Sequence, residues 1–298
     1  MKLIKQSFEI LDQQCSLEGV YKMIEKVGRV CYKSEDKIAE GTAKSFVDRL
    51  MKSGHGAMLE HGTIYLDMPN SAGDYNLVPF FASNPYSRVV IEPLNDRVHN
   101  YITTNFRVIV ENFAEEYIPD VLQYICKPTE YHVKRVTVHF VCDRGVSHEF
   151  VRHRTFSFAQ ESTRYCNYSR DKFGNELTFI KPCWFDSSLI DDTGHWNANT
   201  FYKMPTQSVE EDAFLGTLLS IEKSYFNLLE CGWKPQEARV VLPNALKTEL
   251  VMTGFVDESG WINFFNLRAL GTTGAPHPQA KEFAEPLLEE FKAKGLIK

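Results

Sequence analysis

Apolar residues recur along this chain with two different spacings, and the way these spacings interleave constrains the fold class. Residues 16–27 have apolar side chains at helical spacing behind Ser16, a residue type that commonly caps a helix N-terminus. The segments 64–68 and 136–142 instead alternate with a period of two, which is typical of strands, and the first ends at Pro69. Helices and strands therefore mix throughout the chain, and we predict an α+β fold with an antiparallel or mixed sheet flanked by helices.

The same patterns predict the other elements. Ser208 and Glu211 form a capping-box pattern at the start of the clearest long helix, and Ser259 is the predicted cap of a later one. The region 70–100 is predicted to form long loops around a short strand at 88–91. The further expected elements are helices over 43–52, 100–116, 120–126, 235–242, 259–270 and 283–294, a helix ending near Arg152, and strands over 177–180 and 250–255. No repeat or linker divides the chain, so we expect one domain over residues 1–298.

Composition limits the classes of function. The chain lacks an apolar run of about 18 residues or a signal-peptide pattern, so we expect a soluble, cytoplasmic protein without membrane contact. Its 7 cysteines are scattered with no CxxC pair, which favours reduced thiols over structural zinc. A net charge of −6 disfavours general nucleic-acid binding, because affinity for the phosphate backbone needs a broad excess of cations. Any anion site must be local.

One segment has the composition of such a site. From Arg152 the chain reads RHRTFSFAQESTRYCNYSR, which gathers several arginines among serine and threonine hydroxyls. Guanidinium groups bind phosphate in a bidentate manner, and hydroxyls supply the remaining donors. The residues alone leave a phosphate site and a structural ion-pair network equally open.

Arg152-His153-Arg154, followed after seven residues by Ser162, resembles the signature of the flavin-dependent thymidylate synthases. Other parts of the chain resemble further segments of that family in the same order. These are Arg29–Tyr32, Gly54-His55 with Glu60-His61, Glu237–Arg239 with Leu242-Pro243, and Asn263–Arg268.

The resemblance implies a reaction and an architecture. The expected fold is that of the thymidylate synthase complementing proteins, with extra material around 70–130 and 184–205. The expected reaction is reductive methylation of dUMP to dTMP, with methylenetetrahydrofolate as carbon donor and NADPH-reduced FAD as hydride source. It also implies a homotetramer with active sites at subunit interfaces.

The resemblance also assigns residues, and it assigns no metal ligand. Arg268 is the expected catalytic residue, because its counterpart stabilises negative charge on the pyrimidine and so activates C5. The FAD-binding residues implied are His55, Glu60, Arg152, His153, Arg154, Gln160, Asn263 and His277. The dUMP-binding residues implied are Glu149, Arg152, Gln160, Glu161, Ser162, Thr163, Arg164, Arg239 and Arg268.

Two departures from the family pattern bear on the base. Glu149 stands where the family has an amide, and Gln160 stands where it has a carboxylate. Exchanging these groups changes the donors and acceptors offered to the pyrimidine. A same-fold enzyme that methylates or hydroxymethylates dCMP is therefore the alternative.

Three other interpretations are weaker. An RNA-binding protein is disfavoured by the acidic charge, and a nucleotide sensor without turnover is disfavoured by the retained Arg268 and His55. Cys183 follows a proline, as the nucleophile of the classical thymidylate synthases does, but no base is predicted beside it, so we expect an idle thiol.

Overall fold

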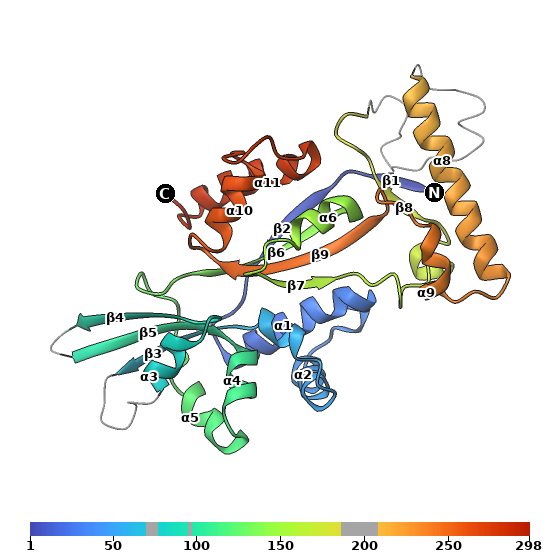
Figure 1. The fold of residues 1–298 in the computed structure, drawn as a ribbon. Coiled ribbons are helices and arrows are strands. Elements are labelled where there is room, and N and C mark those ends of the chain that lie inside the picture. Colours follow the sequence, from blue (N-terminus) through green and yellow to red (C-terminus); the bar gives the residue numbers. More distant parts are fainter. Residues whose placement is uncertain (70–76, 95–96, 186–207) are drawn as a thin grey trace.

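A central four-stranded sheet carries the fold. The computed structural model describes residues 1–69, 77–94, 97–185 and 208–298, so the predicted excursion at 184–205 lies outside the described residues from 186 on. The sheet has the order β2-β6-β9-β7, and all its neighbouring strands are antiparallel. The strands are β2 (Ser7–Leu11), β6 (Arg135–Asp143), β9 (Lys247–Phe255) and β7 (Ser157–Gln160). The α+β prediction is confirmed (Figure 1).

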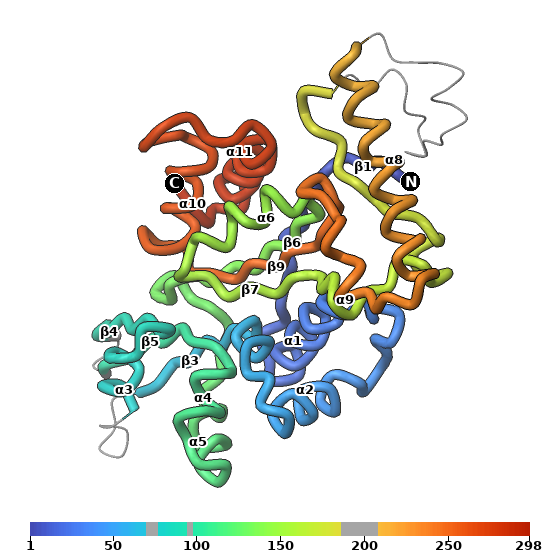
Figure 2. Tube along the Cα trace, turned by 45° about the vertical axis from the view of Figure 1, so that its right-hand side comes forward, coloured from blue at the N-terminus to red at the C-terminus, as the bar shows by residue number. Residues whose placement is uncertain are grey.

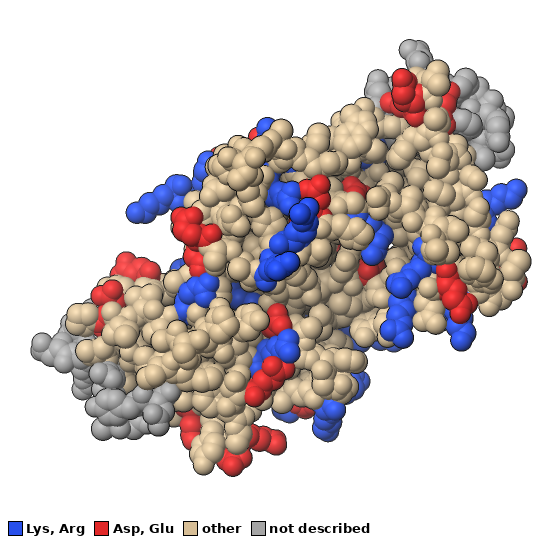
Figure 3. Space-filling view, viewed as in Figure 1, with Lys and Arg blue, Asp and Glu red and all other residues tan. Residues whose placement is uncertain are grey.

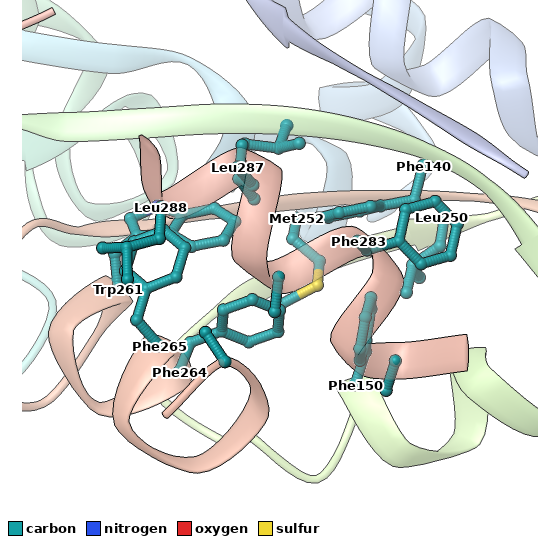
Figure 4. Close-up of a cluster of buried hydrophobic side chains, with 14 of the residues drawn as sticks. Phe140, Phe150, Leu250, Met252, Trp261, Phe264, Phe265, Phe283, Leu287 and Leu288 are labelled. Atoms are coloured by element: carbon teal, nitrogen blue, oxygen red, sulfur yellow. The ribbon is translucent and has the colours of Figure 1, made fainter. Parts of the chain in front are cut away.

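Helices cover both faces of this sheet. Alternate residues of β6, among them Val138 and Phe140, point into an aromatic core shared with α6 (Arg144–Phe150), α10 (Trp261–Arg268) and α11 (Pro278–Ala293). Figure 4 shows Phe150, Phe264 and Phe283 meeting there. On the opposite face, Met23 and Val27 of α1 (Leu17–Tyr32) pack against Val251 of β9. The strand predicted at 136–142 is therefore present but buried along most of its length rather than on one face.

The N-terminal helices agree with the sequence prediction. The Ser16 side chain accepts a hydrogen bond from Gly19 N at 3.1 Å, and α1 ends where Lys33 adopts a left-handed conformation. The helix predicted at 43–52 is α2 (Thr42–Lys52). A 3-10 helix, η2 (Gly56–His61), then leads into β3 (Thr63–Pro69), the strand predicted to end at Pro69.

A second, three-stranded sheet of order β3-β5-β4 corrects two predictions. Within residues 70–100, the short strand predicted at 88–91 is present as the longer β4 (Arg88–Leu94), whereas α3 (Leu77–Ser83) lies where a loop was predicted. The helix predicted at 100–116 is wrong up to Asn105, because β5 (Arg97–Asn105) pairs with both β3 and β4. The helical part is α4 (Phe106–Asn112), followed by α5 (Ile118–Leu122). The pairing of β5 with a strand on each of its two sides determines its conformation, although the spacing of its apolar residues along the sequence also suits a helix.

The third part of the fold contains the longest described helix. Strands β1 (Lys2–Ile4) and β8 (Thr178–Ile180) pair in parallel beside α8 (Val209–Glu230), close to the N-terminus (Figure 2). Ser208 caps α8 as predicted, accepting from Glu211 N at 3.2 Å. The helix predicted at 235–242 is a short α9 (Pro235–Ala238) continued by a 3-10 turn, η5 (Arg239–Val241).

One predicted cap is wrong. Gly260, not Ser259, precedes α10, and the Asp257 carboxylate accepts from Gly260 N at 2.9 Å. The last predicted helix is α11, and the chain leaves it at Gly295, whose φ is +66°. Among the described residues, none of the helices is both long and apolar enough to cross a membrane.

Candidate active site

The Arg152–Arg154 segment lies in the turn that joins α6 to β7. Asp143 starts α6 by accepting from Val146 N at 2.7 Å, and the helix ends at Phe150, which is fully buried in the aromatic core. The core thus fixes the end of α6. Arg152 and Arg154 are exposed in the turn, whereas His153 between them is buried. Three consecutive residues therefore present two surface cations and one interior imidazole.

Arg268, the last residue of α10, reaches this turn from a distant part of the chain. Its guanidinium donates to the Glu149 carboxylate, to the Glu149 backbone carbonyl at 2.9 Å and to His153 Nε2 at 3.2 Å. Its side chain is only 15% exposed. Arg268 is therefore held in place by the protein before any ligand binds.

His153 is a neutral acceptor in this arrangement. Burial and, secondarily, the Arg268 guanidinium lower the pKa of His153 to about 4. Since Nε2 accepts from Arg268, the proton of the neutral ring is on Nδ1. Burial and Arg268, rather than the flanking Arg152 and Arg154, keep the ring neutral.

These residues border a cavity of about 820 Å³, which we call the signature cavity. Its other wall is the segment from Thr273 to His277, which precedes α11, and Asn263 of α10 also lines it. The predicted residues that the structure brings together here are Glu149, Arg152, His153, Arg154, Asn263, Arg268 and His277. Thr155, Ser259 and Leu267 also line the cavity and were not predicted as site residues, although Ser259 was expected as a helix cap and Leu267 lies in the segment Asn263–Arg268.

A second group of predicted residues lies apart from this cavity. We call this group the serine-loop cluster; it follows β7 and adjoins α9. It consists of Ser162, Thr163, Arg164 and Arg239. Arg239 donates to Thr163 Oγ1 at 3.5 Å, and Arg164 donates to Gln236 at 3.3 Å. Neither arginine lines the signature cavity. Figure 3 shows Lys and Arg side chains in separate groups, one between α6 and α10 and another near α9.

Glu161 and Gln160 make hydrogen bonds at the start of the segment after β7 that carries Ser162 and Thr163, which we call the serine loop. Glu161 is 2% exposed, and its carboxylate pairs with Lys247 at 2.8 Å and accepts from the Tyr168 hydroxyl at 3.0 Å. The Gln160 amide donates to Ser147 at 2.8 Å and to Thr248 at 3.2 Å. Neither residue borders the signature cavity in this chain.

His55 and Glu60 also lie elsewhere. His55 is exposed and approaches Ser53 Oγ at 3.2 Å, and Glu60 pairs with Arg107 at 2.6 Å beside a smaller cavity of about 270 Å³. The single chain thus does not bring all the predicted residues to one place.

Comparison with known proteins decides the family. The model of the family described as "Thymidylate synthase complementing protein" matches residues 93–294, a range that contains the signature cavity residues and the serine-loop cluster but not His55 or Glu60. The chain belongs to this family. It is an enzyme of the flavin-dependent thymidylate synthase family, and the resemblance found in the sequence is confirmed.

The relatives of the chain are distant. It is 27% identical to a flavin-dependent thymidylate synthase of Pyrococcus furiosus over 196 residues, 66% of this chain and 70% of that protein. The enzyme of the same description from Pyrococcus horikoshii is 26% identical over 223 residues, 73% of this chain and 79% of the relative. Among solved structures, a UMP/dUMP methylase, PolB from Streptomyces cacaoi bound with 5-Br dUMP, is 18% identical over 99% of this chain and 92% of that one, with a TM-score of 0.41.

Proposed function

We propose that this enzyme methylates C5 of a 2′-deoxypyrimidine 5′-monophosphate, taking the carbon from methylenetetrahydrofolate and the hydride from NADPH-reduced FAD. With uracil as the base, this is the conversion of dUMP to dTMP, which the names of the relatives support. With cytosine, it is methylation or hydroxymethylation of dCMP. The observation that carries the proposal is the convergence of Arg152, Arg154, Asn263 and Arg268 on one cavity.

The cavity suits an anionic cofactor. Its volume of about 820 Å³ lies within the range of cofactor pockets, and Arg152 and Arg154 at its edge offer donors for phosphate groups. We assign Arg152, Arg154, Asn263 and His277 to the binding of FAD, which supplies the hydride when bound. The buried His153 orients Arg268 through its Nε2. His55, Glu60 and Gln160 are proposed to contact FAD on resemblance alone.

Arg268 is assigned the activation of the pyrimidine. A guanidinium fixed before the reaction stabilises charge that develops on the base without first having to reorganise. The serine-loop cluster is assigned the 5′-phosphate, because Arg164 and Arg239 are exposed cations beside the Ser162 and Thr163 hydroxyls. Glu149 and Glu161 complete the proposed nucleotide set, Glu161 as the buried anchor of the loop.

We further propose that the enzyme is a homotetramer in which the serine-loop cluster of one subunit completes the signature cavity of another. The separation of the two groups within one chain supports this arrangement. Analytical ultracentrifugation should then give the mass of four chains, and a monomer would contradict it.

The direct test of the proposed function is the visible absorption of the purified protein under anaerobic conditions. Flavin bands that bleach with NADPH, together with a methylated nucleotide formed on adding methylenetetrahydrofolate and dUMP or dCMP, are the expected result. A protein that takes up no FAD would contradict the proposal. Flavin reduction without turnover of either nucleotide would instead indicate a sensor.

A further inference from the structure

We propose that Glu149 and Arg268 together read the pyrimidine base, and that they select cytosine over uracil. This inference rests on the proposed function for the type of reaction and deepens it by naming the acceptor. The observation that supports it is that Glu149 is the only carboxylate among the described residues that line the signature cavity.

The contacts of Arg268 show that its position does not depend on the Glu149 carboxylate alone. The Glu149 backbone carbonyl at 2.9 Å and His153 Nε2 at 3.2 Å hold two of its nitrogens independently. A guanidinium has more N–H donors than the three bonds made here, so donors remain for a ligand.

The contacts of Glu149 leave an acceptor available beside those donors. Its Oε2 accepts from Arg268, whereas Oε1 has no hydrogen-bond partner among the described residues, and the side chain is 33% exposed. Glu149 and Arg268 both line the cavity. The pair therefore offers an acceptor and a fork of donors next to each other.

Cytosine matches this arrangement at every position. Its N4 amino group is a donor, which carboxylates accept from, and its N3 and O2 atoms are adjacent acceptors that suit the two donors of a guanidinium fork. The carboxylate thus faces N4 while Arg268 faces N3 and O2. No hydrogen-bond donor of the base then faces a donor of the protein, and no acceptor faces an acceptor.

Uracil matches the same pair less well. With the ring in the same position, its O4 faces the Glu149 carboxylate, so two acceptors meet. If the ring shifts so that N3–H meets the carboxylate, only one carbonyl remains within reach of the guanidinium fork. Ionisation at N3 does not help, because it places a second negative charge beside Glu149. A mismatch of this kind weakens binding by about tenfold to a hundredfold.

The experiment compares dCMP and dUMP binding to the FAD-loaded enzyme by titration calorimetry. We expect dCMP to bind at least about tenfold more tightly, and N4,N4-dimethyl-dCMP, which lacks the amino donor, to lose that advantage. The Glu149→Gln variant should lose the preference for dCMP, since an amide donates as well as accepts. Glu285→Gln on the surface of α11, where the carboxylate pairs with Lys281, is the matched control and should keep it.

The outcomes separate this inference from the proposed function. Equal or tighter binding of dUMP to the unaltered enzyme, with flavin bound and turnover of dUMP present, overturns the cytosine preference and leaves the proposed function standing. Absence of flavin and of both nucleotides overturns the proposed function itself. The dimethyl analogue keeps the test decisive even where Glu149→Gln fails to fold, because it needs no substitution.

Discussion

The signature cavity and the serine-loop cluster are both built around arginine, but the two regions treat the guanidinium group differently. Arg268 is largely buried and tied to Glu149 and His153. Arg164 and Arg239 are exposed, and their guanidinium groups donate to the neutral side chains of Gln236 and Thr163. No carboxylate of a described residue pairs with either of them. The first region is fixed in advance, whereas the second keeps its charge available for an incoming dianion.

This difference implies different functions for the two regions. A fixed, partly neutralised guanidinium discriminates between ligands by hydrogen-bond pattern, and an exposed unpaired one attracts any phosphate. Substitutions in the cavity should therefore change turnover or the choice of base, and substitutions in the cluster should weaken the binding of all nucleotides alike. Each prediction below tests one side of that division.

The largest effect is expected for Arg268→Ala. Removing a fixed donor at the position where charge develops lowers kcat by about a hundredfold to a thousandfold. FAD retention, followed by absorbance after desalting, should change little, because Arg152, Arg154 and Asn263 remain. Turnover close to that of the unaltered enzyme would remove Arg268 from the chemical step.

A substitution at Glu161 tests whether the serine loop depends on its buried anchor. Glu161→Gln removes the charge that faces Lys247 and weakens the bond from Tyr168. Lys247 keeps Glu249 as a second partner, so the loss is that of charged hydrogen bonds, about 2 kcal/mol, and the midpoint of urea denaturation should fall. Glu289→Gln, whose pair with Lys292 is exposed, should leave the midpoint unchanged. Equal midpoints for both variants would show that the loop is held by other contacts.

The protonation of His153 tests the preorganisation of the cavity. Its pKa is about 4 in the folded chain and near 6.5 when unfolded, so the unfolded state takes up the proton first as the pH falls. The stability that neutral His153 contributes is present above pH 6.5 and is lost on descending towards pH 4, by about 3 kcal/mol. The slope of unfolding free energy against pH should be shallower in His153→Gln, and parallel slopes would contradict the assignment.

The sequence was informative wherever the signal was local. Ser16 and Ser208 cap their helices as predicted, because a cap depends on a residue and the amide three positions later. The strand over Arg97–Asn105 was missed, because apolar residues at Tyr101, Ile102 and Phe106 also suit a helix. Only its pairing with β3 and β4, remote in sequence, decides the conformation.

The same limit applies to the site. The contiguous run Arg152–Arg154 was recognisable in the sequence, since its residues are neighbours. The pairing of Arg268 with Glu149 joins residues 119 positions apart, and no local pattern predicts it. Strand β7 lies between Arg154 and Ser162, which is eight residues later, and Ser162 does not line the signature cavity. The sequence does not show this separation.

The smallest effect is expected for Arg164→Ala, which tests whether the exposed arginines of the serine-loop cluster bind the phosphate. One charge-assisted hydrogen bond to phosphate contributes about 1.5 kcal/mol, so nucleotide affinity should fall about tenfold. Because the cluster is assigned the phosphate only, dCMP and dUMP should weaken by the same factor and their ratio should stay constant. Arg170→Ala removes another exposed arginine of the same segment and serves as the control. A change in the ratio of the two affinities would mean that the serine loop also reads the base, and the division between a discriminating cavity and an attracting cluster would fail.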